Sequence, residues 1–210
     1  MKKRILCFGD SNTWGAIPNK QGRYDENTRW TGVLQNLLGD RAAVVEEGLN
    51  GRTTVWDDPI EDKKSGLSYL PTCLQSQYPL DLVILMLGTN DCKERFAASP
   101  ESIAQGNQHL IHIIQSGLYC MPVPKVLLVS PIWMNETVTM HPGVDIFGKD
   151  AVQKSQGLSE KFKAVAQLCG CCFFDAATAA QSSHIDGVHM DPANHQALGK
   201  AIYEEVCKIL

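Results

Sequence analysis

The sequence of 210 residues lacks any apolar run near the roughly 20 residues that a membrane-spanning helix needs. It also lacks a block of basic residues, and its formal net charge is -4. Nucleic acid and anionic membrane surfaces are therefore excluded as expected partners. No internal repeat, low-complexity segment or linker divides it. With 44% hydrophobic residues, the sequence predicts one globular domain over residues 1–210.

An export signal and a metal-binding cysteine pattern are missing too. The apolar part of the opening M-K-K-R-I-L-C-F ends at Phe8 without a cleavage site, so we expect a cytoplasmic protein with reduced cysteines. Cys7 and Cys172 lie in apolar runs, which predicts small core residues. The C-G-C-C cluster at 169–172 has no second cysteine pair or histidine pair at zinc spacing, so we expect no metal there.

Strand and helix patterns alternate from one end of the chain to the other. Continuous apolar runs predict strands buried on both faces, at 5–8, 43–45, 82–87, 126–129 and 172–174. Helical spacing of apolar residues predicts helices at 30–38, 67–77, 103–114, 158–165 and 192–206. The alternation predicts an α/β domain with three layers and right-handed crossovers. Two long irregular stretches, 16–28 and 131–149, are candidate lids or binding loops.

Polar clusters follow four of these strands. They occur in the segments G-D-S-N, E-G-L-N-G-R-T-T, L-G-T-N-D and H-I-D-G-V-H. Ligands of open parallel sheets bind beyond the carboxyl ends of the strands, so we expect the clusters to meet at one rim. The residues of interest are Ser11, Asn50, Gly51, Asn90, Asp91, Asp186 and His189.

This set of side chains has the chemistry of a serine hydrolase. His189 can take the proton of Ser11, and Asp186, three residues before the histidine, can fix the imidazole tautomer. The backbone N–H groups of Ser11 and Gly51 and the side-chain amide of Asn90 can donate to an oxyanion. The G-x-S-x-G elbow is absent.

Each piece has a structural alternative when it is taken singly. A serine after a strand is usually a turn or cap residue, and Asp91 could cap the segment that follows it. Gly51 could be needed only because its backbone angles favour glycine. Turn and cap chemistry does not explain why the pieces fall together at successive strand ends.

The four blocks resemble those of the SGNH hydrolase superfamily, the GDSL-type esterases. The match comprises residues 9–12, 48–54, 87–91 and 186–189, and its order and spacing agree across the chain. Longer stretches, such as R-I-L-C-F-G-D-S and D-L-V-I-L-M-L-G-T-N-D, are similar to the bacterial arylesterase and acyltransferase branch.

The resemblance implies a flavodoxin-like sheet of order 2-1-3-4-5 in an α/β/α sandwich, with no metal and no cofactor. It implies Ser11 as nucleophile, His189 as base and Asp186 as its orienting acid. It also implies an oxyanion hole made by Ser11, Gly51 and Asn90.

The chain departs from that branch at two positions near the serine. Asn12 stands where the branch usually has leucine, and Ala16 stands where it tends to have a second tryptophan. The change at Ala16 could widen or wet the acyl pocket, which bears on acyl transfer in water more than on hydrolysis. Trp14 could wall the acyl site or pack under its loop. We treat Asn12, Trp14 and Asn50 as candidate substrate contacts.

The remaining candidates are expected to be structural or peripheral. Arg52 could contact a substrate carboxylate, but a salt bridge that holds its own loop is favoured. His141 could touch substrate from the loop 131–149, whereas His184 is expected to be a loop residue. Cys92 lacks a base at fixed spacing and is not the expected nucleophile. The histidines expected to be packed or on the surface are His109, His112 and His195.

The sequence predicts a serine esterase that forms an acyl-enzyme from small esters with short acyl chains. Water takes the acyl group, with an alcohol or a peroxide as alternative acceptors. A carbohydrate O-deacetylase, a lysophospholipase or a thioesterase could use the same catalytic set. A catalytically silent binding protein would keep the scaffold without the activity. A nucleotide-binding module is disfavoured, because this chain has no phosphate-binding glycine loop after its first strand. The natural ester, its acyl length and the existence of a homo-oligomer stay open.

Overall fold

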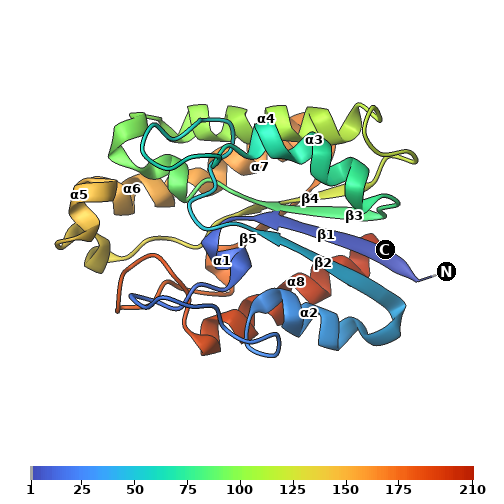
Figure 1. Ribbon diagram of the computed structural model, residues 1–210, viewed down its shortest axis with the longest axis horizontal. Coiled ribbons are helices and arrows are strands. Elements are labelled where there is room, and N and C mark those ends of the chain that lie inside the picture. Colours follow the sequence, from blue (N-terminus) through green and yellow to red (C-terminus); the bar gives the residue numbers. More distant parts are fainter. Residues whose placement is uncertain (1) are drawn as a thin grey trace.

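A five-stranded sheet with helices on both faces organises the computed structural model, which describes residues 2–210 (Figure 1). The strands are β1 (Lys3–Gly9), β2 (Ala42–Gly48), β3 (Leu82–Met86), β4 (Lys125–Ser130) and β5 (Cys172–Asp175). All four strand pairs are parallel, and the order is β2-β1-β3-β4-β5. Both the predicted α/β class and the strand order implied by the resemblance are confirmed.

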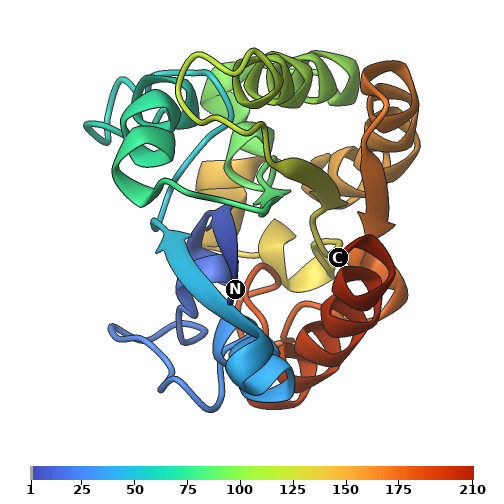
Figure 2. The ribbon, with the colours of Figure 1, turned by 90° about the vertical axis from the view of Figure 1, so that its right-hand side faces the viewer.

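Five longer helices form the two outer layers. They are α2 (Trp30–Leu38), α3 (Gly66–Gln77), α4 (Pro100–Gln115), α7 (Leu158–Cys169) and α8 (Pro192–Ile209). Helices α3, α4 and α7 cover one face of the sheet, and α2 and α8 cover the other (Figures 1 and 2). Each begins within three residues of its predicted start. The Asp191 side chain accepts the N–H of Asn194 at 2.9 Å and so caps α8 as expected.

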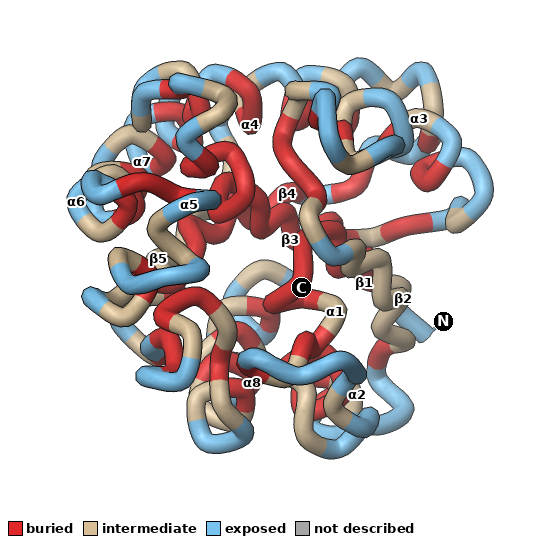
Figure 3. The backbone as a smooth tube through the Cα atoms, turned by 60° about the vertical axis from the view of Figure 1, so that its left-hand side comes forward, coloured by how far each residue is buried: buried red, intermediate tan, exposed pale blue. Residues whose placement is uncertain are grey.

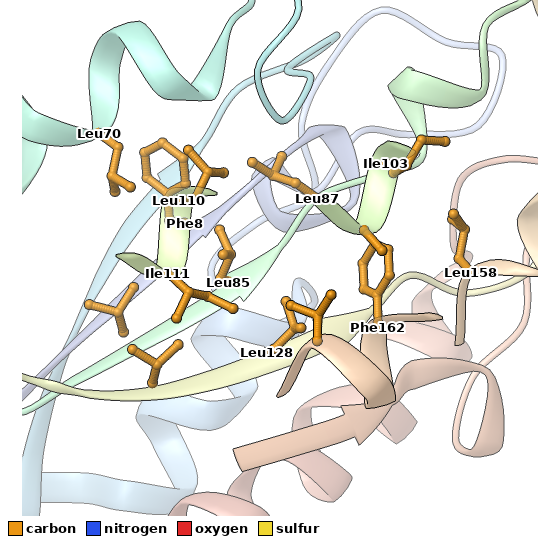
Figure 4. Packing of buried hydrophobic residues seen from close by; sticks show 14 of the residues in the cluster. Phe8, Leu70, Leu85, Leu87, Ile103, Leu110, Ile111, Leu128, Leu158 and Phe162 are labelled. Carbon is orange, nitrogen blue, oxygen red and sulfur yellow. The ribbon is translucent and has the colours of Figure 1, made fainter. Parts of the chain in front are cut away.

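Successive residues of the inner strands point to opposite sides of the sheet and enter different cores. On β1, Leu6 and Phe8 pack toward α3, α4 and α7 (Figure 4), whereas Ile5 and Cys7 pack toward α2 and α8. Each fully buried side chain of this size contributes about 1.5–3 kcal/mol to folding. The inner strands read as continuous apolar runs because both of their faces are covered.

The edge strands are covered less completely, which corrects one prediction. Cys172 opens the edge strand β5 and is exposed, so it is not a core residue, whereas Cys7 on the inner strand β1 is fully buried. Figure 3 shows the same contrast between the buried β3 and β4 and the more exposed outer segments. An apolar run alone does not distinguish an inner strand from an edge strand.

The stretch 131–149 is less irregular than predicted, since it contains η4 (Glu136–Thr139) and α5 (Gly143–Phe147). These elements are too short to show a helical hydrophobic period. Further short helices are α1 (Ser11–Trp14), η1 (Gly39–Arg41), η2 (Asn90–Cys92), η3 (Glu94–Phe96), α6 (Ala151–Gln156) and η5 (Ala176–Thr178). None of the helices described in residues 2–210 has the length and apolar content of a membrane-spanning segment.

Candidate active site

Ser11 lies at the start of α1, directly beyond the carboxyl end of β1. The preceding Asp10 caps this short helix, because its carboxylate accepts the N–H of Asn12 at 2.9 Å. In Figure 1, α1 lies at the end of the sheet toward which α5 and α6 also extend. The predicted rim at the carboxyl ends of the strands therefore carries the serine.

His189 bridges Ser11 and Asp186 with its two ring nitrogens. Its Nε2 lies 2.9 Å from Ser11 Oγ, and its Nδ1 lies 2.7 Å from Asp186 Oδ2. A carboxylate acceptor at Nδ1 favours the tautomer with the proton on that nitrogen, which leaves Nε2 free to accept the serine proton. The three residues that the sequence placed after two different strands are thus in direct hydrogen-bond contact.

The environment of Asp186 keeps it ionised. Burial acts to raise its pKa, but the hydrogen bond and charge of His189 and the backbone N–H groups of His189 and Val188 outweigh burial and lower the pKa. Both N–H groups reach Asp186 Oδ1 at 2.9 Å. The Asn19 N–H adds a contact to Oδ2 at 3.2 Å, so the loop 16–28 also touches the carboxylate. Sequence spacing gave no signal for Asn19.

Asn12 fixes the backbone on either side of His189. Its Nδ2 donates to the Val188 carbonyl at 3.2 Å, and its Oδ1 accepts the Met190 N–H at 3.1 Å. The side chain is only 2% exposed and does not line the cavity above the serine. The structure therefore corrects the predicted substrate contact, since Asn12 is absent from the cavity lining and both ends of its amide bond the histidine loop.

Trp14 also lies outside the cavity lining. The Arg23 guanidinium sits 5.5 Å from its ring centroid, and Arg23 Nε donates to the Trp14 carbonyl at 2.6 Å. Of the two roles considered for Trp14, packing with its loop agrees with these contacts, and walling the acyl site does not.

Three candidate oxyanion donors line the same cavity as the serine hydroxyl: Ser11, Gly51 and Asn90. Within residues 2–210, the backbone N–H groups of Ser11 and Gly51 have no protein acceptor. Asn90 Nδ2 donates one hydrogen to the Arg52 carbonyl at 3.2 Å, which leaves its second hydrogen for a ligand. Gly51 has φ +79°, a conformation that residues with a Cβ rarely adopt.

Arg52 holds its loop from beneath, but through carbonyl groups rather than the salt bridge that was favoured. Its guanidinium donates to the carbonyl of Gly9 at 3.0 Å and to that of Glu47. It also stacks over Phe8 at 4.2 Å and Tyr69 at 5.2 Å. Because it is buried under the loop, Arg52 is not placed to meet a substrate carboxylate.

Asp91 likewise joins two loops and does not cap the segment that follows it. Its Oδ1 accepts the Thr54 N–H at 2.8 Å and the Thr54 hydroxyl at 2.5 Å. The 3-10 helix that contains Asp91 has no side-chain cap.

A cavity of about 910 Å³ lies over the serine, and it has two kinds of wall. Both long loops contribute to it, as expected for binding loops. Its apolar lining includes Ile17, Met140, Ile146, Phe147, Ile185 and Val188. Its polar lining includes Asn50, Glu61, Lys93, Arg95 and His141. Asn50 is thus placed for the substrate contact that the sequence suggested.

Part of the polar wall is an ion-pair cluster that the sequence did not reveal. Lys93 Nζ lies 2.7 Å from Glu61 Oε1, and Arg95 lies 2.9 Å from the same oxygen and 2.7 Å from Asp58. The Lys93 side chain is only 5% exposed. These partners are about 30 residues apart in the chain, so no local spacing connects them.

The cysteines and histidines other than His189 make no hydrogen bond with Ser11 or Asp186 among the described residues. Cys92 is fully buried, which raises the pKa of its thiol and disfavours the thiolate. His195 is buried in α8, and Cys169 Sγ lies 3.8 Å from His112 on the surface of α4. His141 lines the cavity, and its Nδ1 lies 2.7 Å from Asp145 Oδ2. Among the described residues, no group of three or more histidine, cysteine or acidic side chains is arranged to hold a metal ion.

Comparisons with known proteins show which structures this chain resembles. The native aryl esterase of M. smegmatis superposes with a TM-score of 0.93 at 42% identity, covering 99% of this chain and 100% of that one. Est24, a carbohydrate acetylesterase from Sinorhizobium meliloti, superposes with a TM-score of 0.93 at 39% identity over 100% of both chains. A lipase/acylhydrolase from Enterococcus faecalis, at 18% identity and a TM-score of 0.70 over 97% of this chain and 95% of that one, shares the fold.

A search of curated proteins gave no match. The model of the GDSL-like lipase/acylhydrolase family matches residues 7–197, which is most of the chain. The chain therefore belongs to the GDSL-like lipase/acylhydrolase family.

Proposed function

We propose that this chain is a serine esterase that hydrolyses small carboxylic esters with short acyl chains through an acyl-enzyme. The observation that supports this most directly is the contact series from Ser11 Oγ through His189 to Asp186, at 2.9 and 2.7 Å, beneath an open cavity. A serine hydroxyl in contact with an oriented imidazole is the arrangement that nucleophilic acyl transfer requires.

In the acylation step, His189 Nε2 takes the proton of Ser11 Oγ while that oxygen attacks the ester carbonyl carbon. The carbonyl π electrons move to the oxygen and form a tetrahedral oxyanion. The imidazolium then gives its proton to the leaving alkoxide as the ester C–O bond breaks, which releases the alcohol. Asp186 stabilises the imidazolium and keeps its ring oriented.

In the deacylation step, water repeats the attack on the acyl-enzyme, and His189 again takes and returns one proton. The oxyanion of each step accepts hydrogen bonds from the Ser11 and Gly51 N–H groups and from Asn90 Nδ2. A preorganised donor of this kind contributes about 2.7–4 kcal/mol to transition-state stabilisation. An alcohol or a peroxide that enters in place of water would give acyl transfer.

A carbohydrate O-deacetylase is the second candidate function, and the polar wall of the cavity favours it. Glu61 offers a carboxylate acceptor, whereas Lys93 and Arg95 offer donors, and sugar hydroxyl groups both donate and accept. Est24, which is named a carbohydrate acetylesterase, is among the similar structures. A single domain over residues 1–210 would carry either activity, in the cytoplasm, as a monomer or a homo-oligomer.

The test is hydrolysis of p-nitrophenyl esters from acetyl to long acyl chains, with labelling of Ser11 by a fluorophosphonate. Activity should peak between acetyl and butyryl, and Ser11→Ala should abolish both hydrolysis and labelling. Ser130→Ala, which removes a buried hydroxyl bonded to Asp175, is the matched control and should keep both. Labelling that persists in Ser11→Ala would refute the nucleophile assignment. Faster release of acetate from acetylated sugars than from p-nitrophenyl acetate would favour the second candidate.

A further inference from the structure

We infer that Asp91 and Thr54 form a positioning pair that sets the distance between the oxyanion donors Gly51 and Asn90. The inference rests on the proposed function, since it assigns a task to two residues that support those donors. Neither residue lines the cavity, so neither is expected to touch substrate.

The pair joins the two loops that carry the donors. Asp91 directly follows Asn90, and Thr54 lies three residues after Gly51. One oxygen of the Asp91 carboxylate accepts both the N–H and the hydroxyl of Thr54, at 2.8 and 2.5 Å. Beside the donors themselves, a second hydrogen bond runs from Asn90 Nδ2 to the Arg52 carbonyl, at the longer distance of 3.2 Å. Farther along the same loops, Lys93 and Arg95 bond Glu61 and Asp58. Of the two links next to the donors, the Asp91 carboxylate makes the shorter hydrogen bonds.

Helix α4 closes the other side of Thr54. A Cβ on Gly106 would lie 2.4 Å from Thr54 Oγ1 and 3.0 Å from its Cβ, so the helix backbone approaches the threonine directly. The Thr54 carbonyl accepts the N–H of Leu67 at 2.9 Å behind it. Thr54 is fully buried and confined, and a change in its bond to Asp91 must be passed to the loop of Gly51.

A neutral amide at position 91 would satisfy the same two donors, yet the chain has a carboxyl group with one buried oxygen unpartnered. Asp91 Oδ2 has no hydrogen-bond partner among the described residues, and such a group costs free energy. A charged acceptor makes shorter and stronger hydrogen bonds than a neutral one. The gain that offsets this cost is a tighter link between the two donor loops.

The ionisation of Asp91 predicts how kcat depends on pH. Burial, together with the charge of Asp10, raises its pKa to about 6, against the Thr54 hydrogen bonds that lower it. Asp10 is the titratable group that faces it from the end of β1, and Asp10 in turn feels His189 and Arg52. Above about pH 6 the carboxylate holds Thr54 most tightly, and protonation below that value weakens the link.

The experiment compares Thr54→Val and Asp91→Asn with the wild type and with Ser130→Ala. Ser130→Ala removes a buried hydroxyl bonded to the Asp175 carboxylate at 2.9 Å, at the same rim but in strands β4 and β5. With p-nitrophenyl acetate, kcat should fall roughly 5- to 30-fold in both variants with KM nearly unchanged, below the roughly 100- to 1000-fold cost of losing a donor itself. Thr54→Ser, which keeps the hydroxyl, should recover most of the rate. In the pH profile of kcat, Asp91→Asn should also lose the part of the fall toward acid pH that occurs near pH 6.

The rate of fluorophosphonate labelling at Ser11 gives a second readout, since it forms a similar oxyanion. It should fall in parallel with kcat in the two folded variants. If kcat and labelling in both variants stay within twofold of Ser130→Ala, the positioning role is overturned while the proposed function stands. If the wild type is neither labelled nor active, the proposed function and this inference both fail. If Thr54→Val does not fold, the same criteria apply to Asp91→Asn.

Discussion

Replacing Asn12 with alanine should uncouple the catalytic histidine from the helix that carries the serine. Asn12 is the only side chain described that bonds the backbone on both sides of His189, at Val188 and Met190. Because Ser11 and Asn12 are neighbours on α1, these bonds set the position of His189 relative to Ser11. The alanine variant deletes both bonds without adding a group that could clash.

The magnitude follows from what the deletion leaves behind. Met190 is fully buried and Val188 is 8% exposed, so an N–H and a carbonyl lose their partners in a place that bulk water does not reach. Each unsatisfied buried group costs about 1–3 kcal/mol. We expect the free energy of unfolding to fall by about 2–4 kcal/mol, the sum of two groups in the lower part of that range.

The effect on catalysis should exceed what lower stability alone explains. A displacement of a catalytic group by 1 Å can cost about 100-fold in rate, so we expect kcat to fall roughly 10- to 100-fold at a temperature where the variant is folded. KM for p-nitrophenyl acetate should change little, since Asn12 does not line the cavity.

The assay combines urea unfolding with steady-state hydrolysis, and Asn107→Ala is the matched control. Asn107 is also a fully buried asparagine, and its Nδ2 donates to the Leu87 and Ile103 carbonyls at 3.3 and 3.4 Å, away from the histidine loop. The control should lose stability but keep kcat within about threefold. If Asn12→Ala loses stability like the control and also keeps kcat within about threefold, the two hydrogen bonds of Asn12 have no role in placing His189.

Two further outcomes test the donors and the buried charges. Asn90→Ala should lower kcat roughly 100- to 1000-fold, and a loss below about threefold would remove Asn90 from the oxyanion hole. Burial lowers the pKa of His195 to about 4 from its ordinary 6.5, so the unfolded chain binds its proton first and stability falls as pH drops from about 6.5 to about 4. This loss amounts to about 3 kcal/mol, and it opposes Asp91, whose raised pKa favours the folded state at low pH. Urea unfolding at pH 7 and pH 4.5 should therefore show a smaller acid loss in His195→Gln than in the wild type; an equal loss would contradict the assignment.

The sequence could predict the sheet and the meeting of the strand-end clusters because both follow from local patterns and one rule of topology. Continuous apolar runs mark the inner strands, and all parallel strands end at one rim. Ser11, Asp186 and His189 lie up to 178 residues apart in the chain and still meet. Ser11 stands just beyond β1, and Asp186 and His189 lie between β5 and α8, whose positions were visible in the sequence. The short helices within 131–149 were missed since four or five residues cannot display a helical period.

The partners of the site residues could not be predicted, because a polar side chain in a loop has no periodicity to show what it faces. Yet the residues whose partners could not be predicted share one position relative to the expected catalytic residues. Asp10 precedes Ser11, Asn12 follows it, and Asp91 follows Asn90; all three are buried. When a reactive side chain points into a cavity from a tight turn, its chain neighbours are directed back into the protein, where their polar groups must find partners. A polar residue directly beside a predicted catalytic residue is therefore best interpreted first as a support that fixes the site, and only then as a contact to substrate. Asn12, expected at the substrate and found at the histidine loop, is the case that separates the two interpretations.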